Sequence, residues 1–320
     1  MRLSTNMIYQ QNMDAVLDGQ NRFQATGLQL STGSKVSKPS DDPLAASQAV
    51  LVRQASAENK QFSVARTFAN QSMSQEESIL SSVTSTIQDA QTLIVQAGDG
   101  SLSDDDRSSL ATKLESLKSQ LLNMSNSTDG NGRYIFAGYK SDTPPFTQDA
   151  TTGAVSYSGG TTAITQQVDA SRTMTINHTG NEVFQTLTGD AKAEPNGDPS
   201  EPDIFKTIDG ALKALKTPSA DYTTDTEYTD AIGKANRGLS NSLNNVLSVR
   251  SELGTQMSEL DTLDTLGDNR EVTNASKLSD LVDTDWTSAI STYTLQQVAL
   301  QASYKTYSTM QGMSLFQMNS

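Results

Sequence analysis

The chain has 320 residues, of which 35% are hydrophobic and 6% aromatic, and it contains no cysteine. Its formal net charge is −14 and its 23 basic residues are dispersed, which excludes a nucleic-acid-binding surface built from clustered Lys and Arg. The absence of cysteine excludes disulfides and thiolate metal sites. The low hydrophobic share is typical of slender helical bundles, which have more surface for their volume than one round core.

The first predicted element is a helix that ends at the stop signal Ser31-Thr32-Gly33-Ser34. Its apolar positions alternate in steps of four and three, which is the heptad pattern of a coiled coil. Two of the seven positions, Gln20 and Gly27, are weak. The full stripe comprises Tyr9, Met13, Val16, Gln20, Phe23, Gly27 and Leu30.

A second, very long helix is predicted from about residue 44 to 97. Asp42 is a suitable N-cap, Pro43 suits the first helical position, and no Gly or Pro interrupts residues 44–97. The steps of four and three persist throughout. They run through Leu44, Gln48, Leu51, Ala55, Glu58, Phe62, Ala65 and Ala69, and then through Met73, Glu76, Leu80, Val83, Ile87, Ala90, Ile94 and Ala97.

The third predicted helix begins after Ser103, which with Asp106 resembles a capping box that has Asp in place of the usual Glu. Its stripe is leucine-rich and should pack antiparallel on the second helix. We expect Leu114, Leu117 and Leu121 to be buried there.

The composition then changes to Gly, Thr, Ser and Pro, with short β-type runs over residues 155–176. We expect a β-rich module with few contacts to the helices. Helices return at residues 203–216, about 226–266 and about 286–311. The last carries a stripe of Trp286, Ile290, Tyr293, Gln297, Leu300, Tyr304 and Tyr307.

We therefore predict a mainly α fold in which the N- and C-terminal halves form a long antiparallel coiled-coil or helical-bundle rod, with a small β-rich domain inserted in the middle. Three domains are expected: a terminal coiled-coil assembly domain of residues 1–43 and 281–320, a helical rod of 44–138 and 203–280, and a β-rich outer insert of 139–202.

The two terminal stripes have no adjacent element in sequence to pack against, and a lone amphipathic helix is marginal in water. We expect them to be disordered until they meet each other or other copies of the chain. The predicted assembly interface is Tyr9, Met13, Val16, Phe23, Leu30, Trp286, Ile290, Tyr293, Leu300, Tyr304 and Tyr307.

No pattern predicts a catalytic, cofactor or metal site. His178 is the only histidine, Asp41-Asp42 suits a helix cap, and Asp104-Asp105-Asp106 suits the first turn of a helix. Asp129-Gly130-Asn131-Gly132 lacks the ligand series of a calcium loop. We therefore expect a protein that is not an enzyme and needs no cofactor.

Three segments resemble the flagellin superfamily. Residues 31–43 are similar to the loop that follows the superfamily's first helix, with Asp41-Asp42-Pro43 at its end and Arg53 downstream. Arg250-Ser251-Glu252-Leu253-Gly254 resembles its "R-x-x-L-G" helix, and Gln296 to Ala302 resembles its Gln- and Ala-rich last helix.

Within the superfamily, the chain is more similar to the hook-associated junction proteins than to filament flagellin. The segment Tyr134-Ile-Phe-Ala-Gly to Pro145-Phe146 carries this resemblance, together with the opening Met1-Arg2-Leu3-Ser4-Thr5 and the ending Met313-Ser314-Leu315-Phe316. Filament flagellin remains the alternative.

The resemblance implies a structural protein of the bacterial flagellum that joins hook to filament by coiled-coil self-assembly. It implies other copies of the chain in a ring, the neighbouring hook-associated junction protein, flagellin and an export chaperone as partners, with neither nucleic acid nor membrane insertion. It also implies an extracellular location reached through the flagellar type III exporter. Residues 1–6 contain no apolar stretch of a cleaved signal, which fits that route.

Overall fold

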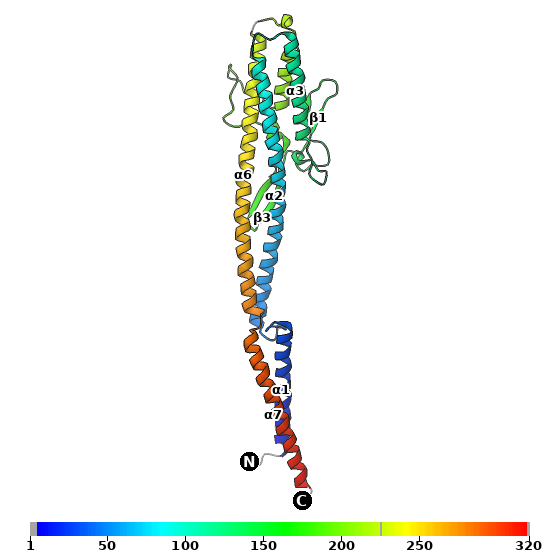
Figure 1. The fold of residues 1–320 in the computed structure, drawn as a ribbon, viewed down its shortest axis with the longest axis vertical. Coiled ribbons are helices and arrows are strands. Elements are labelled where there is room, and N and C mark those ends of the chain that lie inside the picture. The colour runs from blue at the N-terminus through cyan, green and yellow to red at the C-terminus, as the bar shows by residue number, and fades with distance from the viewer. Residues whose placement is uncertain (1–4, 225, 319–320) are drawn as a thin grey trace. The chain divides into compact units, whose positions relative to one another are not determined.

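The computed structural model describes residues 5–224 and 226–318 (Figure 1). The helices are α1 (Thr5–Thr32), α2 (Pro43–Ala97), α3 (Asp104–Ser125), α4 (Gly180–Phe184), α5 (Ile204–Lys216), α6 (Glu227–Val282) and α7 (Trp286–Met318), with short 3-10 turns at Ile135–Ala137 and Ser219–Asp221. The strands are β1 (Phe146–Gln148), β2 (Val155–Tyr157), β3 (Ile164–Asp169) and β4 (Arg172–Asn177). They pair antiparallel as β1–β2 and β3–β4. The predicted fold class, mainly α with a small β region, is confirmed.

The chain divides into two compact units. The smaller unit contains residues 1–59 and 268–320, and the larger contains residues 60–267. Helices α2 and α6 each contribute a segment to both units. The β region belongs to the larger unit, whereas the sequence favoured a separate domain for residues 139–202.

In the larger unit, α2 and α6 run antiparallel. The Tyr228 hydroxyl donates to the carbonyl of Ala97 at 2.7 Å, and the Arg250 guanidinium binds Glu77 at 2.6 Å. The predicted α2 stripe from Met73 to Ala97 is buried at every position. Leu114 and Leu121 of α3 are also fully buried, but Leu117 is only half-buried, so the prediction for that residue is wrong.

The β region shares one hydrophobic core with the helices. Val168 and Met174 from the β3–β4 hairpin are buried in the same cluster as Met73 and Leu80 of α2. The Phe146, Phe184 and Phe205 rings meet with centroids 5.3–6.2 Å apart. The expectation of few contacts is therefore wrong. Gly- and Thr-rich composition signals turns and strands, and it does not signal independence from the helices.

The smaller unit contains α1, α7, the first part of α2 and the last part of α6. Asp42 caps α2 as predicted, since its Oδ1 accepts the N–H of Ala45 at 2.9 Å. The predicted stripe is wrong at the start of α2, where Leu44 and Leu51 are exposed and Ala45 and Ala49 are buried instead. Apolar residues occur on both of these faces, and the heptad count favoured the larger ones.

Candidate assembly surface

Helices α1 and α7 pack antiparallel within the smaller unit. The Phe23 ring stacks on Tyr293 with centroids 4.5 Å apart. Tyr293 also lies against Gly27, where an added Cβ would meet its ring at 3.4 Å. Gly27, a weak heptad position by hydrophobicity, thus leaves room for a large side chain of the partner helix. The α1 stripe thus meets α7 of the same chain, which is one of the two kinds of partner expected for it, and α7 covers only part of it.

The end of α1 is fixed by backbone geometry. Gly33 has φ +72°, the left-handed conformation that commonly follows a helix C-terminus and suits glycine. Its carbonyl accepts the N–H of Thr284, and the N–H of Lys35 donates to the Val282 carbonyl, at 2.9 and 2.8 Å. These bonds join the chain before α2 to the chain before α7.

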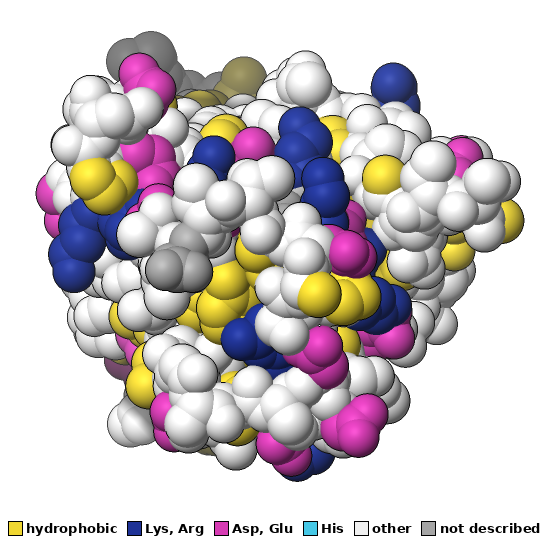
Figure 2. All heavy atoms as spheres, turned by 90° about the horizontal axis from the view of Figure 1, so that it is seen from above, with side chains coloured by type: hydrophobic (Ala, Val, Ile, Leu, Met, Phe, Trp, Pro, Cys, Tyr) yellow, Lys and Arg dark blue, Asp and Glu magenta, His cyan; other side chains and the backbone are white. Residues whose placement is uncertain are grey.

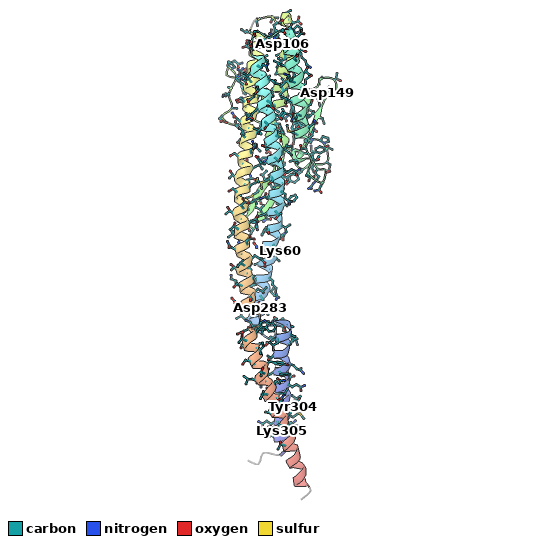
Figure 3. All side chains as sticks on the ribbon, in the orientation of Figure 1. Lys60, Asp106, Asp149, Asp283, Tyr304 and Lys305 are labelled. Carbon is teal, nitrogen blue, oxygen red and sulfur yellow. The ribbon has the colours of Figure 1, made fainter. Side chains whose placement is uncertain are left out.

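The predicted interface residues differ in how far the chain itself covers them. Val16 is buried, whereas Phe23, Leu30, Tyr293, Leu300 and Tyr307 are half-buried. Met13, Trp286, Ile290 and Tyr304 are exposed, with Tyr304 marked on α7 in Figure 3. Tyr9 lies in α1, but its side chain is outside the part that the structure describes. The α1–α7 contact therefore uses only part of the predicted set.

Sequence reasoning missed several exposed apolar residues outside the single stripe it assigned to each helix. They are Met7, Leu17 and Leu28 on α1, and Leu295 and Val298 on α7. The signal was present in α7, where apolar residues recur around the whole helix. A helix that is hydrophobic on all sides is normally buried on all sides. One partner helix cannot provide that burial.

A second exposed apolar area lies at the start of α2 and the end of α6, within the same unit. Leu44, Val50, Leu51 and Val272 are each at least 60% exposed. A mainly apolar groove of about 390 Å³ is lined by Gln48, Leu51, Val52, Lys277, Asp280 and Leu281.

The polar face of α1 is typical of a solvated helix. The Arg22 guanidinium forms an ion pair with Asp18, one turn earlier, and the hydrogen bond and charge of Arg22 hold the pKa of that carboxyl below its usual value. Figure 2 shows the larger unit, viewed from the top of Figure 1, and on that face basic side chains are interspersed with acidic and hydrophobic ones. No broad single-sign patch covers that face.

The acidic residues considered for chemistry have structural partners. Asp41 accepts the N–H groups of Ser37 and Lys38, and Asp106 completes the capping box of α3 with Ser103. Asp129 binds its own loop through Asn131 and Arg133. Asp106 and Asp149 are marked in Figure 3, and Asp149 accepts the N–H groups of the turn after β1.

Among the described residues, no group of three or more His, Asp or Glu could hold a metal ion. No described helix is long and apolar enough to cross a membrane.

Comparisons with known proteins agree with this architecture. A family model described as the bacterial flagellin N-terminal helical region matches residues 3–141. The flagellar hook-associated protein 3 of Salmonella typhimurium is 57% identical and that of Escherichia coli 55%, each over 100% of both chains. These full-length relatives favour the hook-associated interpretation over filament flagellin.

Solved structures share the fold. A flagellar hook-associated protein from Vibrio parahaemolyticus aligns with a TM-score of 0.64 and 21% identity, over 76% of this chain and 100% of that chain. The flagellar junction protein FlgL from Legionella pneumophila aligns with a TM-score of 0.60 and 21% identity, over 74% of this chain and 100% of that chain.

The relatives belong to a family of structural flagellar proteins rather than of enzymes. The chain therefore belongs to the flagellar hook-associated protein 3 family, which shares its N-terminal helical region with bacterial flagellin, and it is a structural component of the flagellum.

Proposed function

We propose that this chain joins the hook to the filament and that its smaller unit makes the contacts that hold the junction together. The observation that carries the proposal is the exposure of large apolar side chains around α7. Ile290, Leu295 and Val298 are 54%, 69% and 60% exposed although α1 already packs on the same helix. Full burial of one such side chain stabilises an interface by about 1.5–3 kcal/mol.

The occupants of this surface are other copies of the chain, arranged in a ring. Helices α1 and α7 of neighbouring copies cover one another, and the second exposed area at Leu44, Val50, Leu51 and Val272 adds contacts. Residues 1–43 and 281–320 are the proposed assembly domain. The eleven residues of the predicted interface act there together with Met7, Leu17, Leu28, Leu295 and Val298.

The ring has a neighbouring hook-associated junction protein on one side and flagellin on the other. The description of the Legionella relative as a junction protein supports this position. An export chaperone covers the apolar termini before secretion. The chain then leaves the cell through the flagellar type III exporter and acts outside the cell.

The proposal can be tested with Leu295→Asp. A buried, unpaired carboxylate opposes assembly strongly, whereas the same charge on an exposed helix leaves the monomer folded. We expect normal secretion of the variant, hooks without filaments in electron micrographs, and loss of swimming.

The matched control is Val95→Asp on α2 of the larger unit, where Val95 is 65% exposed. It should retain filaments. Normal filaments in cells that export Leu295→Asp at wild-type level would contradict the proposal.

The amount of the chain in sheared filaments distinguishes a junction protein from filament flagellin. A junction protein is a trace component of such filaments, whereas flagellin is their bulk protein.

A further inference from the structure

The only histidine of the chain is buried against a buried carboxylate. His178 follows β4 and precedes Thr179, the N-cap of α4, and it is 6% exposed. Its Nδ1 lies 3.0 Å from Oε1 of Glu76, and its backbone N–H donates to both carboxylate oxygens of Glu76 at 3.2 and 3.3 Å. Glu76 occupies a stripe position of α2 and is 0% exposed.

Two further carboxylates face the same ring. The His178 Nε2 lies 3.7 Å from Glu252 of α6, and Nε2 is buried without a hydrogen-bond partner. Glu182 of α4 acts on the ring by charge. One imidazole therefore lies among acidic groups of α2, α4 and α6.

The geometry determines which protonation state fits. While Glu76 is ionised it only accepts, and Nδ1 then carries the proton of the bond between them. A neutral ring then has no proton on Nε2, and its lone pair faces the Glu252 carboxylate. An imidazolium donates at both nitrogens and meets a negative charge on each side.

We propose that His178 is a protonation-dependent clamp, whose imidazolium ties the β4–α4 junction to α2 and α6 and whose deprotonation releases that junction. This role is separate from assembly, since all four residues lie in the larger unit.

The expected pH dependence has a definite sign. Burial opposes charging of the ring, but the hydrogen bond and charge of Glu76, with Glu252 and Glu182, raise the pKa of His178 above its ordinary value. Burial raises the pKa of Glu76, against the opposing effect of His178. Both directions mean that the folded pair keeps its proton to a higher pH than the unfolded chain does.

Stability falls with rising pH wherever the folded state binds more protons. The contribution of His178 is therefore complete below about pH 6.5, the ordinary imidazole value, and is lost as pH rises through its higher folded pKa. The contribution of Glu76 to stability also falls as pH rises, and this loss begins above the ordinary pKa of a glutamate carboxyl. The clamp thus holds in mildly acidic surroundings and loosens in alkaline ones.

The single histidine allows a direct test on the intact chain. Heteronuclear NMR of the ring nitrogens as pH is raised should show that both nitrogens are still protonated above about pH 6.5, the ordinary pKa of imidazole. Hydrogen exchange should show that protection of the amides in residues 172–184, corrected for intrinsic exchange, falls about tenfold per pH unit over the range in which the ring titrates. Amides of α3 serve as the internal reference and should not follow this slope.

Variants sharpen the test. Glu76→Gln and Glu252→Gln should each lower the pKa of the ring, with the larger shift from Glu76→Gln. Glu259→Gln on α6, whose carboxylate pairs with exposed Arg172, should leave it unchanged. His178→Asn should abolish the pH-dependent loss of protection.

A ring that titrates at or below the ordinary value would overturn the proposal, and this result requires no variant. So would a pH-dependent loss of protection that persists in His178→Asn.

Discussion

The two units of this chain have the same heptad spacing, but their apolar stripes are buried within the chain to different extents. In the larger unit, Leu80, Ile87 and Ile94 are fully buried in a core cluster that also contains residues of α3, α5, α6 and the β region. In the smaller unit, the buried hydrophobic residues among those described are Val16, Ala45, Ala49 and Ala289, while many of the large ones are exposed. A periodic apolar stripe thus specifies that a helix face will be covered. It does not specify whether the cover comes from the same chain.

This difference predicts that the two units unfold separately, which is the largest effect we expect. A unit that buries mainly alanines gains little free energy from burial. Trp286, the only tryptophan, belongs to the smaller unit. The urea transition followed by its fluorescence should coincide with the first of two steps in the far-UV circular dichroism, because helices of both units contribute to that signal, and the second step should report the larger unit.

Limited trypsin digestion of the monomer provides a second measurement. Cleavage should begin at Arg22, Lys35 and Lys305, before any site in residues 60–267. Coincident urea transitions, together with termini that resist trypsin as long as the larger unit does, would show that the chain is one cooperative unit.

Leu114→Ala tests the core of the larger unit. Leu114 is fully buried, so the change should lower the free energy of unfolding by about 2–5 kcal/mol through lost burial and a cavity. Leu117→Ala, one turn along the same helix at a half-buried position, is the matched control and should cost clearly less. Equal losses in urea denaturation would contradict the assigned face of α3.

These residues show how far the sequence could predict the fold. The stripe from Met73 to Ala97 was assigned correctly because most large apolar residues there share one face, with Val95, 65% exposed, as an exception. The stripe from Leu44 to Glu58 was wrong because Ala45 and Ala49 form a competing face, and periodicity alone does not choose between two apolar faces.

The candidate surface was less predictable than the fold. The stripe marked Val16 and Phe23 as contact positions but did not predict that Phe23 stacks on Tyr293, and the exposure of Leu295 depends on what α1 fails to cover. The His178 cluster could not be found from sequence, since 102 positions separate His178 from Glu76. Only the folded larger unit brings the two together.

Gly138→Ala should have a smaller effect on the larger unit than Leu114→Ala. Gly138 has φ +56°, and an added Cβ would lie 2.7 Å from the Thr162 carbonyl oxygen. Strain of this kind costs about 1–3 kcal/mol. Gly130→Ala is the control, because an added Cβ at that position meets nothing within 4 Å. If both variants unfold at the same urea concentration, the close approach at Gly138 is not a constraint.

The smallest expected effect comes from Phe23→Ala, which removes the stacked pair between α1 and α7. Such a pair contributes about 0.5–1.5 kcal/mol beyond its area burial, and Phe23 is already half-exposed in the isolated chain. The loss should appear only in the transition reported by Trp286, and the circular dichroism transition of the larger unit should stay in place. Leu28→Ala on the same helix is the control, since Leu28 is 47% exposed and its removal should shift neither transition. In the proposed ring the order of effects should differ, because neighbouring copies would cover both side chains and both variants should therefore weaken assembly. A shift of both transitions by Phe23→Ala would mean that the stability of the larger unit depends on the α1–α7 pair, and the contrast between the two units would then fail.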